Sequence, residues 1–96
     1  MKYQTSDSIF TVNSEAAASI HDEGIVILHT GRGCLFSANR IGARIWCDVE
    51  QQKSLEAITE EISSEYQIPL TTAREHLDHF LAQLQKQKLI LREGVS

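Results

Sequence analysis

Several residue types are scarce in this sequence, and each scarcity excludes a class of protein. The 96 residues contain two cysteines, Cys34 and Cys47, which lack the CxxC spacing of zinc ribbons and redox motifs. The longest uncharged apolar run, Ile25–Leu28, is far shorter than the roughly 20 residues that span a bilayer. The first residues contain no apolar stretch of the kind that directs secretion. We therefore expect a cytoplasmic protein with reduced cysteines and no membrane contact.

Positive charge is also scarce. Nine Lys and Arg residues stand against thirteen Asp and Glu residues, which gives a formal net charge of −4 at pH 7. Because proteins that bind nucleic acid neutralise phosphates with a basic surface, this balance argues against a nucleic-acid partner. A DNA-binding winged-helix regulator stays open as an alternative, since the last two helices predicted below could form a helix-turn-helix.

Residues that would perform catalysis or hold a cofactor are missing as well. His76 and His79 can share one helix face, but no further ligand at a zinc-like spacing accompanies them. The glycine-rich segment Thr30–Gly33 joins two predicted strands, whereas a phosphate-binding loop opens a helix. No Ser-His-Asp set or carboxylate pair stands out. We therefore predict a protein that is not an enzyme and that holds no cofactor and no metal.

The composition that is present is typical of one small globular domain. Apolar residues make up 42% of the chain and charged residues 23%, which excludes a disordered chain. A chain of this length supports a single modest core. We predict one domain over residues 1–96, in which residues 1–15 form an N-terminal arm that packs Phe10 against the core.

Strand-forming residues dominate the first part of the chain. We predict strands at Ala16–His21, Ile25–His29 and Cys34–Ala38, separated by turns at residues 22–24 and 30–33. The consecutive apolar residues of the middle strand favour a central strand covered on both faces or nearly so. The result is a three-stranded antiparallel meander in which Cys34–Ala38 is an edge strand.

Helical periodicity begins after the third strand. Either Ser37 or Asn39 can cap the first helix, because each side chain can accept a hydrogen bond from a free backbone N–H group. Ser54 opens the second helix, and Pro69 separates it from the third. The predicted apolar positions of the three helices are Ile41, Ile45, Val49, Leu55, Ile58, Ile62, Ala73, Leu77, Phe80, Leu81 and Leu84.

The ends of this helical region complete the fold prediction. Thr71 or Thr72 is expected to cap the third helix, which runs to about Gln87 and is followed by an extended tail at Leu89–Leu91. Three strands followed by three helices predict an α+β domain of winged helix-turn-helix type. The second helix carries a charged face that we expect to be solvated, made of Glu56, Glu60, Glu61 and Glu65.

The apolar edge strand beside the third helix is the candidate binding site. An unpaired edge exposes backbone donors and acceptors, which are either protected or receive another strand. An edge strand beside a helix suits capture of an extended peptide by strand addition. The alternative is that residues such as Leu35 and Leu77 belong to the core and the edge is simply covered. The candidate peptide-binding residues are Cys34, Leu35, Phe36, Ser37, Ala38, Arg74, Leu77, Asp78, Leu81 and Gln85.

The stretch from Gly24 to Trp46 resembles the signature of PqqD-like proteins. It combines the apolar strand, Gly33, the aromatic Phe36 and Asn39 with a following Gly-Ala and Ile-Trp, in the order and spacing of that family. The later helices also fit, so the resemblance covers about residues 16–92. This chain departs from the pattern at His29, Ala38 and Ile41, and Ala38 makes the end of the edge strand less apolar.

The resemblance implies a RiPP recognition element, which is a small winged-helix domain that binds the leader of a ribosomally made precursor peptide. In that family the leader adds a strand to the third strand and lies against the third helix, which would place contacts on Leu35–Ser37, Arg74, Leu77, Asp78 and Leu81. We expect a freestanding, monomeric or weakly dimeric adaptor. It would deliver the precursor to a separate enzyme, either a leader peptidase of a lasso-peptide pathway, to which the spacing is closer, or a radical enzyme of pyrroloquinoline quinone biosynthesis.

Overall fold

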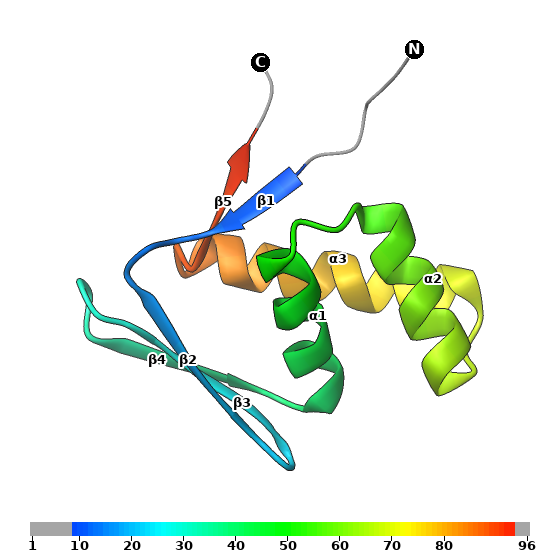
Figure 1. Cartoon of the computed structure of the whole chain (residues 1–96), viewed down its shortest axis with the longest axis horizontal. Coiled ribbons are helices and arrows are strands. Elements are labelled where there is room, and N and C mark those ends of the chain that lie inside the picture. The colour runs from blue at the N-terminus through cyan, green and yellow to red at the C-terminus, as the bar shows by residue number, and fades with distance from the viewer. Residues whose placement is uncertain (1–8, 94–96) are drawn as a thin grey trace.

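A three-stranded sheet and three helices form the body of the protein (Figure 1). The computed structural model describes residues 9–93. Strands β2 (Ala16–His21), β3 (Gly24–His29) and β4 (Cys34–Ala38) pair antiparallel in the order β2-β3-β4. The predicted meander is therefore confirmed, with β4 at one edge. The helices follow in sequence, as expected for the α+β winged helix-turn-helix class.

Strand β3 is covered on one face only, contrary to the prediction that both faces are covered. Ile25, Ile27 and His29 are buried, while Val26 is half-buried and Leu28 is exposed. Side chains alternate between the two faces of a strand, so the three buried residues face the helices together. The helices contact the meander from one side, which leaves its outer face without a covering layer (Figure 1).

His29 has a structural role at the end of β3. Its backbone oxygen accepts from Gly33 N at 2.7 Å, and its ring Nδ1 accepts from Arg32 N at 3.2 Å. These bonds satisfy the backbone N–H groups of Arg32 and Gly33 in the turn that leads into β4. The residue that departs from the family pattern therefore shapes the hairpin that positions β4.

The three helices are α1 (Arg40–Glu50), α2 (Leu55–Tyr66) and α3 (Leu70–Lys86). Two predicted caps are confirmed, since Asn39 accepts from Gly42 N and Ser54 accepts from Ala57 N, both at 3.1 Å. The cap predicted at Thr71 or Thr72 is wrong, because α3 already begins at Leu70. Pro69 occupies the N-cap position there, and its fixed φ lets it open the helix without a side-chain cap.

The two ends of the described chain pair with each other. Strand β1 (Ile9–Val12) lies antiparallel to β5 (Ile90–Glu93) in a separate two-stranded sheet (Figure 1). The arm buries Phe10 as predicted, but it is a paired strand, which the sequence did not indicate. Residues 1–8 of the predicted arm lie outside the described residues.

One apolar core connects these elements. Its largest fully buried side chains come from β3, the three helices and β5, with Trp46 of α1 among them. None of the helices in the described residues is long and apolar enough to cross a membrane. Both cysteines are free thiols, with Cys34 exposed and Cys47 half-buried.

Candidate functional site

The outer edge of β4 is open. Within residues 9–93, β4 pairs with β3 alone, so every second backbone N–H and C=O group of β4 points away from the sheet. Leu35, in the middle of the strand, is 72% exposed. An exposed, apolar edge of this kind is a template for another strand.

A groove of about 250 Å³ lies beside this edge, between β4, α1 and α3. The rings of Phe36 and Phe80 meet in it, with centroids 5.8 Å apart and planes tilted by 51°. None of the eleven lining residues is Asp, Glu, Lys or Arg, so the groove favours uncharged side chains. The lining residues are Phe36, Ser37, Ala38, Asn39, Ile41, Gly42, Ile45, His76, His79, Phe80 and Gln83.

Gly42 of α1 makes room for this arrangement. A Cβ atom at this position would lie 2.6 Å from the Ala38 Cβ and 2.9 Å from the Phe80 Cε1. Both distances are well inside the 3.5–4.0 Å of an ordinary carbon contact. The absence of a side chain at Gly42 therefore lets β4, α1 and the Phe80 ring approach one another around the groove.

Strand β4 runs along α3 in the opposite direction. Its C-terminal end shares the groove with His76 and His79, in the middle of α3. Its N-terminal end, at Cys34 and Leu35, borders a narrower gap together with Gln87 and Leu89, just after α3 ends. A strand added to β4 would thus lie alongside α3 from about His76 to the C-terminal end of the helix.

The structure separates the ten candidate residues into three groups. Phe36, Ser37 and Ala38 line the groove, and Cys34 and Leu35 lie at its far end. Leu77 and Leu81 are buried in the core, as the alternative interpretation held for Leu77. Arg74, Asp78 and Gln85 do not line the groove.

Helix geometry explains the position of this last group. At about 100° per residue, Arg74, Asp78 and Gln85 fall on one flank of the buried stripe of α3. His79 and Gln83 fall on the other flank, next to β4, and their side-chain nitrogens lie 3.1 Å apart. Arg74 Nε donates to Asp78 Oδ1 at 2.9 Å, so this pair satisfies itself away from the groove.

The groove residues that sequence reasoning missed come from two elements. From α1 they are Ile41, Gly42 and Ile45, which the sequence pattern assigns to the core or to the family signature. From α3 they are His76, His79, Phe80 and Gln83, which lie outside the predicted peptide site. The sequence signal for the α3 residues was present, because polar residues flank the apolar stripe on both sides. Nothing in the local sequence indicates which of the two polar flanks of α3 faces β4.

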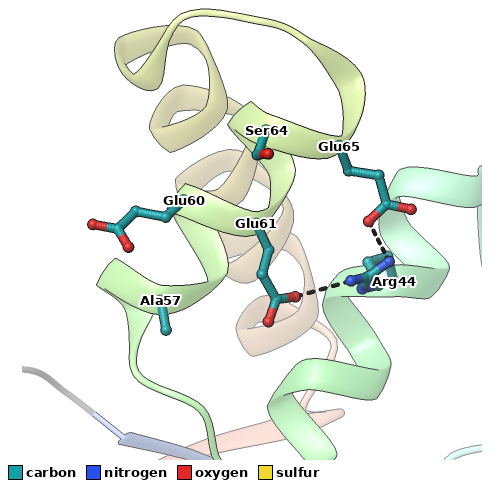
Figure 2. Close-up of a pocket in the computed structure, with 6 residues that line it drawn as sticks. All are labelled: Arg44, Ala57, Glu60, Glu61, Ser64 and Glu65. Atoms are coloured by element: carbon teal, nitrogen blue, oxygen red, sulfur yellow. Dashed lines mark hydrogen bonds and ion pairs between the residues drawn. The ribbon is translucent and has the colours of Figure 1, made fainter.

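A second hollow, of about 540 Å³, lies between α1 and α2 (Figure 2). Arg44 of α1 reaches across to Glu61 and Glu65 of α2, with an Arg44 Nη2 to Glu61 Oε1 distance of 3.2 Å. Lys53 Nζ lies 2.6 Å from Glu61 Oε2 and 3.1 Å from Asp48 Oδ1. The acidic face of α2 is therefore only partly a solvated surface, since Glu61 and Glu65 hold α2 to α1.

The carboxylates of this network have different environments. Asp48 is almost fully buried, and burial, followed by its hydrogen bond with Glu61, raises the pKa of its carboxyl group. Glu61 is more exposed, and the hydrogen bond from Lys53 lowers the pKa of its carboxyl group. A lowered pKa means that charged Glu61 favours the folded state.

We expect Glu61→Gln to lower the free energy of unfolding by about 1 kcal/mol at neutral pH. Because the pKa of Glu61 is depressed in the fold, this contribution is present above its ordinary value of 4.5 and disappears as the pH falls through the folded value. Urea titrations at about pH 7 and about pH 3 measure the difference. Glu60→Gln is the control, since Glu60 lies on the same helix and forms no ion pair with another residue of the described range 9–93. An equal deficit at both pH values would contradict the prediction.

Comparison with known proteins places the chain in a family. The model of the family described as "Coenzyme PQQ synthesis protein D (PqqD)" matches residues 24–90. No curated protein sequence matches the chain. In the described residues, no three His, Cys, Asp or Glu side chains come together as metal ligands would.

Two solved structures share the fold. One, described as "TbiB1 in Complex with the TbiA(beta) Leader Peptide", is 29% identical, with a TM-score of 0.78 over 90% of this chain and 98% of that one. The other, "Lasso peptide synthetase B1 complexed with the leader peptide", is 22% identical, with a TM-score of 0.78 over 85% of this chain and 96% of that one. The family match spans well over half of the sequence, including the stretch from Gly24 to Trp46. The chain therefore belongs to the PqqD family.

Proposed function

We propose that this protein is a RiPP recognition element, a non-catalytic adaptor that binds the leader segment of a ribosomally made precursor peptide. The observation that carries the proposal is the open edge of β4 directly beside the uncharged groove between β4, α1 and α3. The two structurally similar proteins are described in complex with leader peptides, which supports the same ligand class here.

In the proposed binding mode, backbone hydrogen bonds supply affinity and side-chain contacts supply selectivity. The leader adds to β4 as a fourth strand, and its backbone bonds to the free N–H and C=O groups of β4 whatever its sequence. Alternate leader side chains then point into the groove, where Phe36 and Phe80 contact them and His79 and Gln83 border the opening. Leader recognition therefore depends on the flank of α3 that borders the groove, which carries His79 and Gln83.

The proposed partner enzyme is a separate leader peptidase of a lasso-peptide pathway. One of the two structural matches is described as a lasso peptide synthetase, which favours this partner. The alternative partner is a radical enzyme of pyrroloquinoline quinone biosynthesis, to which the family description points. A short precursor gene beside peptidase and cyclase genes would identify the first pathway.

The DNA-binding alternative is less compatible with the charge on α3. Its exposed surface carries Glu75 and Asp78 against Arg74 and Lys86, and Arg74 is already paired with Asp78. A helix that reads DNA needs free basic groups for phosphates. Salt separates the two functions, because phosphate contacts make affinity fall steeply with salt whereas strand addition depends on it weakly.

Isothermal titration calorimetry with the leader of the precursor encoded beside this gene tests the proposal. We expect a dissociation constant below about 100 μM, which corresponds to more than about 5 kcal/mol of binding free energy. Absence of binding at that concentration would exclude the function.

A matched pair of glutamines on α3 tests the position of the site. Gln83→Trp, at the groove, is expected to weaken leader binding at least about tenfold, because the bulky ring occupies the space beside β4. Gln85→Trp, at an exposed position outside the groove, is expected to leave the affinity unchanged. The reverse result would place the leader on the flank of Arg74 and Asp78, where the sequence interpretation had it.

A further inference from the structure

The outer face of the meander, which points away from the helices, carries an apolar row that ends at the open edge. Ala17 pairs with Leu28, and Leu28 pairs with Leu35, so the three side chains stand next to one another on that face. Leu28 is 37% exposed and Leu35 is 72% exposed. Within the described part of the chain, no helix covers this face (Figure 1).

The neighbouring row on the same face has a different character. Ser19 pairs with Val26, and Val26 pairs with Ser37, so this row ends at the open edge with a hydroxyl group. Leu35 and Ser37 are two residues apart on β4, as the alternation of a strand requires. Between them, Phe36 points to the opposite face and into the groove.

A fourth strand on β4 would extend both rows. Side chains directly opposite each other on paired strands stand about 4.5–5.5 Å apart and contact each other. The residue opposite Leu35 would therefore lie on the outer face against Leu35, with Leu28 behind it. The residue opposite Ser37 would lie against the hydroxyl, and the residue between them would enter the groove beside Phe36.

We propose that side chains on the outer face of the meander contact the bound leader on the side opposite the groove and contribute to its selection. Leu35, backed by Leu28, selects an apolar leader residue, and Ser37 selects a small or polar residue two positions along the leader. The inference rests on the proposed function and goes beyond it, because it assigns selectivity to Leu35 and Ser37, whose side chains stand on the face of β4 opposite Phe36. The bound leader is the occupant that this geometry specifies, since the apolar row stops at the edge where the leader strand would begin.

Leu35→Thr tests the proposal, because threonine keeps β-propensity while removing most of the apolar surface. Calorimetry with the leader of the adjacent precursor should show a loss of about threefold to fivefold in affinity. Ile20→Thr is the matched control, since Ile20 is 55% exposed but lies on β2, at the opposite edge of the sheet. The control should bind the leader with wild-type affinity.

A double-mutant cycle identifies the leader residue that contacts Leu35. Each apolar leader residue is changed singly to Thr and titrated into both the wild type and Leu35→Thr. One position should lose affinity in the wild type and lose little more in the variant, which is the non-additivity expected of residues in contact. Strictly additive losses at every leader position would overturn the proposal.

The remaining outcomes separate this inference from the proposed function. If the wild type binds the leader and Leu35→Thr binds it equally well, the inference fails while the function stands. If the wild type does not bind, both fail. Wild-type dimerisation that Leu35→Thr abolishes, measured by sedimentation, would assign the face to a second copy. Unchanged leader affinity of Leu35→Thr with slower enzymatic processing would assign the outer face to the partner enzyme. Dimerisation through this face and contact with the enzyme would each overturn the inference.

Discussion

Gly24→Ala is expected to lower the free energy of unfolding by about 3 kcal/mol, a large share of the stability of a domain this small. A Cβ atom at Gly24 would lie 2.0 Å from the backbone oxygen of Ala38, at the end of β4. Backbone atoms of a paired strand cannot move aside as the end of a side chain can. The φ of Gly24, 157°, adds strain for any L side chain.

Gly33→Ala is the matched control for this prediction. Gly33 also has a positive φ, 68°, but no atom lies within 4 Å of an added Cβ. Gly33→Ala is therefore expected to lower the free energy of unfolding by about 1 kcal/mol, through backbone conformation alone. Urea unfolding followed by the fluorescence of the buried Trp46 compares the variants. Equal losses for Gly24→Ala and Gly33→Ala would show that the contact with Ala38 is not the cause.

Phe36→Ala is expected to weaken leader binding by at least about 100-fold, or about 2.7 kcal/mol. The Phe36 ring connects the strand to the groove through its contact with Phe80, and aromatic anchors at the centre of an interface carry most of the binding energy. The variant should still fold, because Phe36 is only half-buried on an edge strand and the main core lies elsewhere.

Two measurements make the Phe36 prediction decisive. Circular dichroism and urea unfolding establish that the variant is folded, and calorimetry with the leader gives the affinity. Phe36→Leu, which keeps an apolar side chain at the same place, is expected to lose much less affinity than Phe36→Ala. A folded Phe36→Ala protein that binds the leader within about threefold of wild type would remove the ring from the site.

Much of the fold was predictable because its signals are local. The bounds of β2 and β4 agree with the prediction, since turn residues punctuate the apolar and β-branched segments. Asn39 and Ser54 cap α1 and α2 because each side chain satisfies a backbone donor within its own helix. The start of α3 was misplaced, because two threonines resembled a cap more than Pro69 did.

Features that depend on remote pairing were not predictable. Strands β1 and β5 lie at opposite ends of the described chain, and neither segment contains a sequence pattern that indicates which strand it pairs with. The continuous apolar run of β3 suggested cover on both faces, yet the helices pack on one face only. An apolar outward residue such as Leu28 and an apolar inward residue such as Ile27 look the same in a sequence.

The same distinction holds for the candidate binding site. The sequence alone predicted that Cys34–Ala38 is an edge strand, since it is the last strand of a meander, and Phe36–Ala38 line the groove beside that edge. It also determined the buried stripe of α3, through the helical period of its apolar residues. The tertiary structure decided which flank of that stripe meets β4. A helix can be packed with either flank toward the sheet, and the contacts of α1, with Gly42 against Phe80, place His79 and Gln83 beside β4 and leave Arg74 and Asp78 outside the groove.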